Sequence, residues 1–367
     1  MTSGYYGMFS MLVAYLTEIL IKDLLWNKAR QTCFSVLLVS VVRFRTVNLV
    51  KLAAEAVEGA EEASLYRRFQ NFFLKFAMPI DDIGRLVLSK LTKPAKGWTF
   101  SMDRTNWKFG RIHINILVVA VLTEKVAIPI CWRVLPQSTK RGNSNTRHRI
   151  SLMKRLLKLV PADDIKVLTM DREFIGKKWL EWINDKDVKY IVRIKGNVLI
   201  KGKAASRYTH HKQLRSPRTA LVWDTNLFFA GCRITGKNTR DDFLYVVSNH
   251  YNGKEALELY KRRWGIEVVF SHLKKRGFDL ETTHMSDPEK IEKLFGVLTL
   301  AFLICYGWGC KLKKSVDIKA YLKRKSIFRL GLDEIVRMFT NQKRHKDKID
   351  TLFHWLSEQK FDSIIVV

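Results

Sequence analysis

The sequence predicts an α/β protein built on a mixed sheet with flanking helices, with helical regions before and after it. Three β-rich runs, residues 98–108, 112–122 and 126–135, follow one another closely and are typical of a meander. Residues 150–195 then alternate between helical and strand patterns, which is typical of a sheet with helices packed on its faces. The apolar spacing before residue 95 and after residue 253 is helical.

The N-terminal region, residues 1–95, is expected to be a helical DNA-binding domain. Residues 46–57 and 64–76 have apolar side chains at helical spacing, and the second run carries Arg67 and Arg68. Two short helices of this kind suit a helix-turn-helix whose second helix enters the major groove. Many helical hairpins share the pattern, so the high positive charge of the whole chain is what favours DNA.

That charge is +30, from 65 Lys and Arg against 35 Asp and Glu in 367 residues. Hydrophobic residues make up 47% of the chain, which excludes an intrinsically disordered protein. The charge indicates a polyanionic partner, nucleic acid before anionic membrane, and a generic basic surface is the weaker alternative. The five cysteines are widely scattered, which argues against a disulfide framework or a zinc ribbon.

One segment raises the question of a membrane span. Residues 294–310 contain no charged side chain, and their length lies at the lower edge of the roughly 17–25 residues of a transmembrane helix. The alternative is a helix buried inside a folded unit, and a single such segment in this chain favours it. We therefore expect a soluble cytoplasmic protein with no membrane partner.

Two carboxylates stand out in the predicted sheet. Asp103 lies within the first strand and Asp171 ends the apolar run before the second helix. A buried charge is costly unless it is paired or bound to a metal. Pairing with Arg104 or Arg172 would explain each acid by itself. Glu173 is the chief competitor for a role as metal ligand.

A third acid lies in a predicted helix that covers residues 254–275. With about 100° between successive residues, Tyr260, Arg263, Glu267 and Lys274 project within an arc of about 60°. A carboxylate beside Arg, Lys and Tyr suits a site that holds a metal and the phosphates around it. A solvated helix face with ordinary i, i+4 pairs fits the pattern equally well.

These residues carry a resemblance to a known family. The pattern Tyr260-x2-Arg263-x3-Glu267-x6-Lys274 resembles the Y-R-E-K signature of bacterial insertion-sequence transposases of the DDE class. The contexts Asp103-Arg104-Thr105-Asn106-Trp107 and Asp171-Arg172-Glu173-Phe174 resemble the two Asp motifs of that family. The three motifs also have the family's order and spacing.

The resemblance implies an RNase H-like core interrupted by a β-rich insertion. It places Asp103 on the first strand, Asp171 at the end of the fourth strand and Glu267 on a following helix. The implied segments are an N-terminal domain at 1–95, a catalytic core at 96–195 and 242–310, an insertion at 196–241 and a helical C-terminal region at 311–367.

The implied activity is cut-and-paste DNA transposition. Asp103, Asp171 and Glu267 would be the catalytic residues and would bind two Mg2+ ions, for which Mn2+ can substitute. The implied partners are double-stranded DNA, both transposon ends and target, and a second copy of the chain in a homodimer. The excised end would pass through a hairpin, with Trp223 as a candidate for stacking on a flipped base. The location would be the bacterial cytoplasm, at the nucleoid. The expected DNA contacts come from both halves of the chain: Tyr260, Arg263, Lys274, Trp264, Arg104, Asn106, Arg67 and Arg68.

A non-enzymatic alternative stays open. A domesticated or non-catalytic relative would use the N-terminal helices to bind DNA as a regulator. An intact set of three acids speaks against it, because a protein that only binds DNA has no need for three carboxylates beside bound phosphate.

Overall fold

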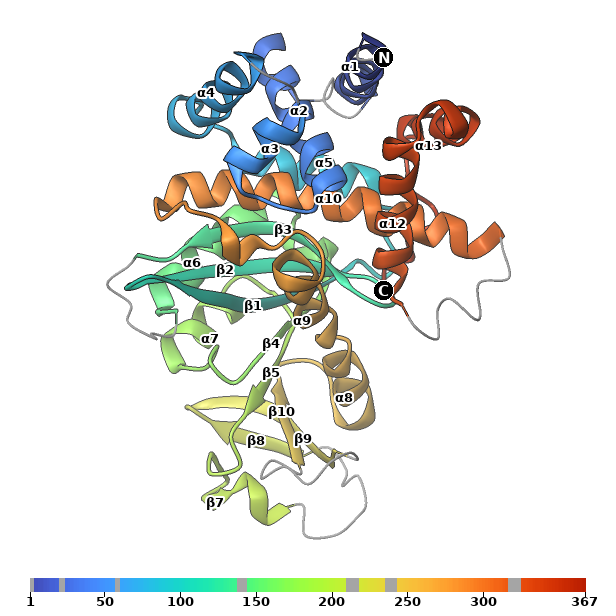
Figure 1. The fold of residues 1–367 in the computed structure, drawn as a ribbon. Helices are drawn as coiled ribbons and strands as arrows, with labels where there is room; N and C mark the ends of the chain where they lie inside the picture. Colours follow the sequence, from blue (N-terminus) through green and yellow to red (C-terminus); the bar gives the residue numbers. More distant parts are fainter. Residues whose placement is uncertain are drawn as a thin grey trace. The chain divides into compact units, whose positions relative to one another are not determined.

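An eight-stranded mixed sheet is the main feature of the middle of the chain (Figure 1). In the computed structural model its strand order is β3-β2-β1-β4-β5-β10-β9-β8. β1 pairs with β4 and β4 with β5 in parallel, whereas the pairs β2–β3, β5–β10, β10–β9 and β9–β8 are antiparallel. The predicted RNase H-like mixed sheet is therefore confirmed. The strands are β1 Trp98–Phe109, β2 Ile112–Leu122, β3 Ala127–Val134, β4 Ile165–Met170, β5 Tyr190–Ile194, β8 Arg218–Val222, β9 Thr225–Arg233 and β10 Phe243–Ser248.

The chain divides into two units, which are described separately. The helical unit contains Met1–Thr92, Trp107–Ile114 and Val269–Ile365, and the sheet unit contains Lys93–Asn106, Asn115–Val268 and Val366–Val367. This division differs from the four predicted segments, because residues 269–310 group with the N-terminal helices. The structure describes residues 3–19, 24–56, 60–136, 144–208, 218–234, 243–315 and 325–367.

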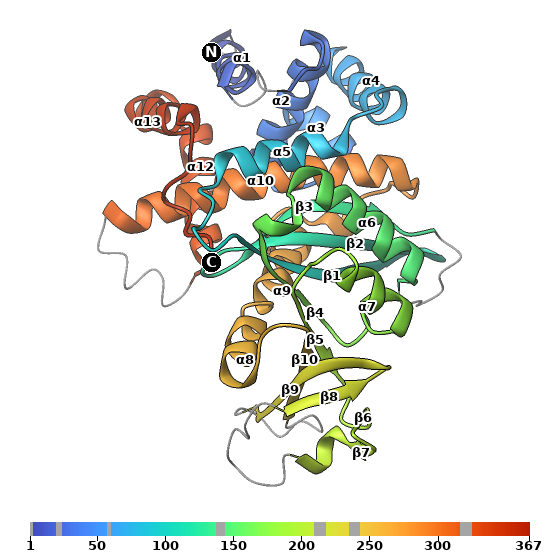
Figure 2. The same ribbon diagram turned by 180° about the vertical axis from the view of Figure 1, so that it is seen from behind.

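Helices cover the strands of the sheet unit. α6 packs on β3 and α7, and α8 packs on β4, β5, β9 and β10. α6 and α7 lie on the opposite side of the strands from α9, as the two views show (Figure 2). α6 begins where the side chain of Asn145 accepts the backbone N–H of His148, an N-cap that satisfies one of the free donors of the first turn. The helices are α6 Thr146–Leu159, α7 Lys177–Asn184, α8 Gly253–Lys261 and α9 Trp264–Ser271.

The residues predicted as a β-rich insertion extend the main sheet. β8 and β9 join it through β10, while β6 Leu199–Ile200 and β7 Lys203–Ala204 form a separate two-stranded sheet. β9 aligns with β10 over six residue pairs, from Phe243 opposite Arg233 to Ser248 opposite Phe228. Residues 209–217 and 235–242 lie outside the described residues.

The helical unit is assembled around α10, which contacts α2, α4, α5 and α12. α10 has the length and the hydropathy of a membrane span, but its apolar stretch is completely buried within the protein. Residues 294–310 thus form a buried core helix, as expected. The helices are α1 Ser3–Ile19, α2 Lys28–Phe44, α3 Leu49–Ala56, α4 Ala60–Lys75, α5 Ile80–Lys90, α10 Pro288–Ser315, α12 Ile327–Thr340 and α13 Lys346–Ser357.

The predicted N-terminal hairpin is present as α3 and α4, which pack on each other. The apolar side chains of α4 that were expected on one side, among them Leu65, Phe69 and Phe73, are buried. Arg67 and Arg68 point away from that core and are exposed. Both arginines of the hairpin therefore lie at the surface of the helical unit.

Candidate active site

The register of the central strands places two of the acids side by side. Met102 of β1 lies opposite Met170 of β4 in a parallel pair. The next residues along the two strands are Asp103 and Asp171. Because the two strands are adjacent and parallel, Asp103, within β1, and Asp171, directly after β4, lie side by side. Asp103 thus lies on the first strand and Asp171 at the end of the fourth, where they were expected.

The predicted continuous helix over residues 254–275 is wrong. α8 ends before Arg263 and α9 begins after it, and the backbone N–H of Arg263 bonds the Tyr260 carbonyl in a tight i, i+3 turn. Gly265 then lets α9 approach the backbone of Val126 closely, because a Cβ at residue 265 would lie 2.8 Å from the Val126 carbonyl carbon. Because Arg263 lies in this break, the axis of α9 does not set the direction of its side chain.

Arg263 joins the first and third acids. Its Nη1 lies 2.7 Å from Oδ2 of Asp103, and its Nη2 donates a hydrogen bond to Oε1 of Glu267 in the first turn of α9. The Arg263 side chain is only 8% exposed. Burial by itself lowers the pKa of the guanidinium, but Tyr260 and the three acids, Asp171 included, raise the pKa of Arg263 above its ordinary value. The arginine is therefore a permanent cation between carboxylates.

Tyr260 contacts the second acid. Its hydroxyl donates to Oδ1 of Asp171 at 3.3 Å, and Arg193 Nη1 lies 3.9 Å from the same oxygen. Burial raises the pKa of the Tyr260 hydroxyl above its ordinary value, so it stays a neutral donor. The guanidinium of Arg263 lies 5.6 Å from the centre of the Tyr260 ring. Tyr260 and Arg263 therefore join all three acids in one site within the sheet unit.

Negative charge is concentrated at Asp103. The pKa of Asp103 is raised to about 6, chiefly by burial, while Arg263 and the Arg104 backbone N–H lower it and Asp171 and Glu267 raise it. A cation close to Asp103 lowers the cost of keeping this carboxylate ionised. Asp171 and Glu267 are thus close enough to Asp103 to act on its charge.

The chemistry of the donors suits a hard divalent cation. Carboxylate oxygens are the ligands that Mg2+ and Mn2+ prefer. Within the part of the chain that the structure describes, however, no three His, Cys, Asp or Glu side chains are close enough to hold a metal as they stand. Arg263 engages one oxygen of Asp103 and one of Glu267. A cation that bound these two oxygens would have to compete with the guanidinium.

Glu173, the competing acid, has other partners. Its Oε2 lies 3.3 Å from Nε of Arg104, and its Oε1 accepts from Oγ of Ser144 at 3.3 Å. Arg104 also donates to Oδ1 of Asn115, which holds its side chain within the sheet unit. Pairing with the Arg104 side chain, the alternative explanation of Asp103, is not observed: from Arg104 the carboxylate accepts the backbone N–H, and its side-chain partner is Arg263. Asn106 is exposed, two residues beyond Arg104.

One buried arginine that is not among the predicted site residues supports the turn after Asp171. Arg149 on α6 donates to the carbonyls of Glu173 at 2.7 Å and Ile175 at 3.1 Å, and its guanidinium lies 5.2 Å from the centre of the Phe174 ring. In the sequence, Arg149 is one basic residue in a basic loop. Its role depends on contacts with residues more than twenty positions away.

We expect Arg149→Met to lower the free energy of unfolding by about 2 kcal/mol, because buried carbonyls lose their donors. Urea unfolding of the purified chain measures the change. Arg147→Met, at an exposed position on the same helix, is the matched control and should change stability by less than about 0.5 kcal/mol. Equal stability of the two variants would show that the carbonyls do not depend on Arg149.

The remaining predicted DNA contacts are spread over both units. Trp264 is 64% exposed at the start of α9 in the sheet unit. Lys274 belongs to the helical unit, in a π-helical turn, and its Nζ lies 3.2 Å from Oε1 of Glu281. Its backbone is not helical, so the expected single stripe from Tyr260 to Lys274 is wrong.

Trp223, the stacking candidate, is half-buried in the turn between β8 and β9, with a φ of 48°. A φ in the left-handed region is uncommon for a residue with a side chain, and the tight connection between the two strands imposes it here. His210, His211 and Lys212, a further basic stretch, lie outside the described residues.

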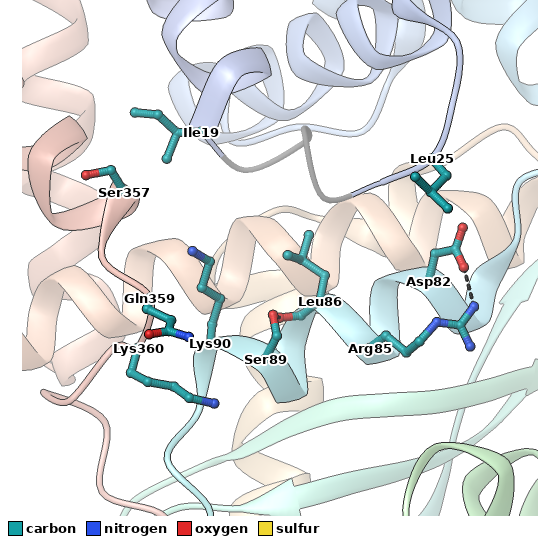
Figure 3. A pocket seen from close by; sticks show the side chains of 10 residues that line it. All are labelled: Ile19, Leu25, Asp82, Arg85, Leu86, Ser89, Lys90, Ser357, Gln359 and Lys360. Carbon is teal, nitrogen blue, oxygen red and sulfur yellow. Dashed lines mark hydrogen bonds and ion pairs between the residues drawn. The ribbon is translucent and has the colours of Figure 1, made fainter.

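The helical unit contains a pocket of about 670 Å3 at α5 (Figure 3). Its polar side chains have partners within the unit. Asp82 accepts from Nε1 of Trp26 at 3.0 Å and pairs with Arg85, and Nζ of Lys90 donates to the Glu358 carbonyl at 2.9 Å. These contacts hold the side chains in place within the helical unit. None of the residues that line the pocket belongs to the acid site.

Comparison with known proteins gives one family match. The model of the family "Transposase DDE domain" matches residues 95–304, more than half of the chain, and this range includes all three acids. No curated protein matches the chain. Among solved structures, the piggyBac transposase in a synaptic complex with hairpin DNA aligns over 95% of this chain and 84% of that chain, with 10% identity and a TM-score of 0.47. The endonuclease V of Bacillus subtilis aligns over 62% of this chain and 91% of that chain, with 11% identity and a TM-score of 0.27.

Proposed function

The chain belongs to the transposase DDE domain family, and we propose that it binds the terminal inverted repeats of a transposon and performs metal-dependent strand cleavage and strand transfer. The observation that carries this proposal is the convergence of Asp103, Asp171 and Glu267 from β1, β4 and α9 around one guanidinium. A single acid on the protein surface would not need two further acids and a buried arginine beside it.

We assign Asp103, Asp171 and Glu267 as the residues that would hold two Mg2+ ions. When bound, the ions supply an activated oxygen nucleophile and stabilise the attacking and leaving oxygens. The chain itself would contribute carboxylates held by β1, by the end of β4 and by the first turn of α9, which limits the reorganisation that the reaction requires. Tyr260 orients Asp171 through its hydroxyl hydrogen bond.

DNA binding would come from the positive charge of the chain and from exposed groups near the acids. Trp264 is the exposed aromatic of the sheet unit closest in sequence to Glu267 and can stack on a base. Tyr260, Arg263 and Lys274 are proposed phosphate contacts, together with Arg104 and Asn106 on β1. Arg67 and Arg68 would bind DNA from the N-terminal hairpin.

We further propose that two copies of the chain hold two transposon ends, and that each end is freed through a hairpin intermediate. Synapsis requires two active sites on two DNA ends, which a homodimer provides. Trp223 is the proposed stacking residue for a flipped base, whose extrahelical position costs a few kcal/mol unless stacking recovers it. The proposed location is the bacterial cytoplasm, at the nucleoid.

The test is incubation of the full chain with labelled DNA that contains the ends of its own transposon. Mg2+ should give nicks at the transposon boundary and joined products with a target plasmid. Specific binding without any cleavage in Mg2+ or Mn2+ would instead support the alternative of a non-catalytic, transposase-derived regulator.

We expect Arg67→Ala/Arg68→Ala to weaken DNA binding without loss of folding, because both side chains are exposed on α4. Each lost phosphate contact should reduce the slope of log affinity against log salt concentration by about 1. Fluorescence anisotropy over a salt series measures this slope. The charge-matched control is Lys343→Ala/Arg344→Ala, also exposed and in the helical unit. An equal reduction in both double variants would indicate a general effect of charge.

A further inference from the structure

Arg263 holds the carboxylate oxygens that a divalent cation would need. Its two terminal nitrogens contact Oδ2 of Asp103 and Oε1 of Glu267, one atom from each acid. Asp171 also attracts the guanidinium electrostatically. A cation that binds these oxygens must first displace the arginine or share them with it. Sharing is unfavourable, because two cations at contact distance repel each other.

The arginine also has an unused donor. Nε of Arg263 is buried and has no hydrogen-bond partner. A buried donor without a partner costs free energy, which a new acceptor recovers. Phosphate oxygens accept paired hydrogen bonds from guanidinium groups in a planar geometry. The contacts of Arg263 with the acids therefore leave one of its donors, Nε, unused. A phosphate oxygen is an acceptor that suits this donor.

We propose that Arg263 is a built-in competitor of divalent cations at Asp103, Asp171 and Glu267, and that a DNA phosphate relieves this competition by drawing the guanidinium away. The inference rests on the proposed function, since it takes these acids as metal ligands. The consequence is ordered loading: the acids bind metal weakly in the DNA-free protein and tightly once DNA is in place. Cleavage without a correctly bound transposon end is thereby suppressed.

The position of Arg263 explains how this can work. The residue lies in the break between α8 and α9, where the backbone leaves the helical path. Its side chain can change partner without rotation of either helix. Asp103 and Asp171 are fixed by β1 and β4, so they keep their places when the guanidinium leaves.

The test measures Mn2+ binding to the full chain without DNA, by isothermal titration calorimetry and by the electron paramagnetic resonance signal of free Mn2+. Arg263→Gln should bind Mn2+ at least about ten-fold more tightly than the wild type, because it removes the cationic group that occupies one oxygen of Asp103 and one of Glu267. Arg263→Gln combined with Asp103→Asn should lose this gain.

Arg193→Gln is the matched control. It removes the same charge near Asp171, 3.9 Å from its Oδ1, and leaves the contacts of Arg263 with Asp103 and Glu267 in place. Its Mn2+ affinity should stay within about three-fold of the wild type. An equal gain in Arg193→Gln and Arg263→Gln would overturn the proposal, because net charge would then explain the result.

An unchanged Mn2+ affinity of Arg263→Gln would also overturn the proposal, while cleavage by the wild type would leave the transposase function standing. If the proposed function itself fails, Asp103→Asn has no effect on Mn2+ binding in any background. If Arg263→Gln does not fold, the Mn2+ affinity of Arg263→Lys tests the proposal instead. Lysine keeps the charge but cannot bridge both acids, so a gain in Mn2+ affinity is expected, and an affinity equal to that of the wild type contradicts the proposal.

Discussion

Asp103→Asn, Asp171→Asn and Glu267→Gln are each expected to reduce cleavage of transposon ends by about 1,000-fold or more, while DNA affinity changes little. Each change keeps the shape of the side chain and removes the negative charge that a metal needs, and metal stabilisation of a phosphoryl transition state amounts to several kcal/mol. Gel analysis of labelled end DNA measures cleavage, and anisotropy on the same DNA measures binding.

Glu173→Gln is the control for this series. It is the same chemical change on a nearby acid whose oxygens are engaged by Arg104 and Ser144. Its cleavage rate should remain within about ten-fold of the wild type. Cleavage retained by any of the three site variants removes that residue from the site, and a complete loss in Glu173→Gln would make Glu173 a ligand.

Gly265→Ala is expected to reduce cleavage by about 100-fold in a chain that still folds. A methyl group at residue 265 would lie 2.8 Å from the Val126 carbonyl carbon and 3.0 Å from the Ala127 nitrogen, so α9 must move away from the sheet. Glu267 moves with the helix, and a displacement of about 1 Å at a reacting centre costs about 100-fold in rate.

Thermal unfolding and the cleavage assay together check this expectation. The control is Glu258→Ala, an exposed position on α8 that should change neither quantity. A Gly265→Ala protein that cleaves at the wild-type rate would mean that the close approach of α9 does not position Glu267.

The sequence predicts the sheet and two of the acids well, for a physical reason. β2 and β4 are mostly apolar and mostly buried, and an acid within or at the end of a buried strand is conspicuous because burial of its charge needs a partner. Asp103 and Asp171 then meet because their strands are adjacent and parallel. The local apolar pattern and the parallel direction of the two strands are therefore enough to predict that these two acids lie close together.

The rest of the site depends on contacts that local patterns do not contain. The apolar spacing of residues 254–275 is helical before and after the break, so it does not predict the turn at Arg263. The break follows from the approach of Gly265 to Val126, which lies far away in the sequence. Arg263 and Asp103 are likewise far apart in the sequence. Neither residue type by itself predicts that the two form an ion pair.

Asp103, Asp171 and Glu267 are proposed to form one metal-binding centre on transposon DNA. Fe2+ in place of Mg2+, with ascorbate and peroxide, cuts a protein backbone next to the bound metal, and Fe2+ is accepted by oxygen ligands. In the complex with end DNA, we predict cuts near residues 103, 171 and 267 together, all suppressed by excess Mg2+. Cuts confined to one of these positions, or located elsewhere in the chain, would contradict the account.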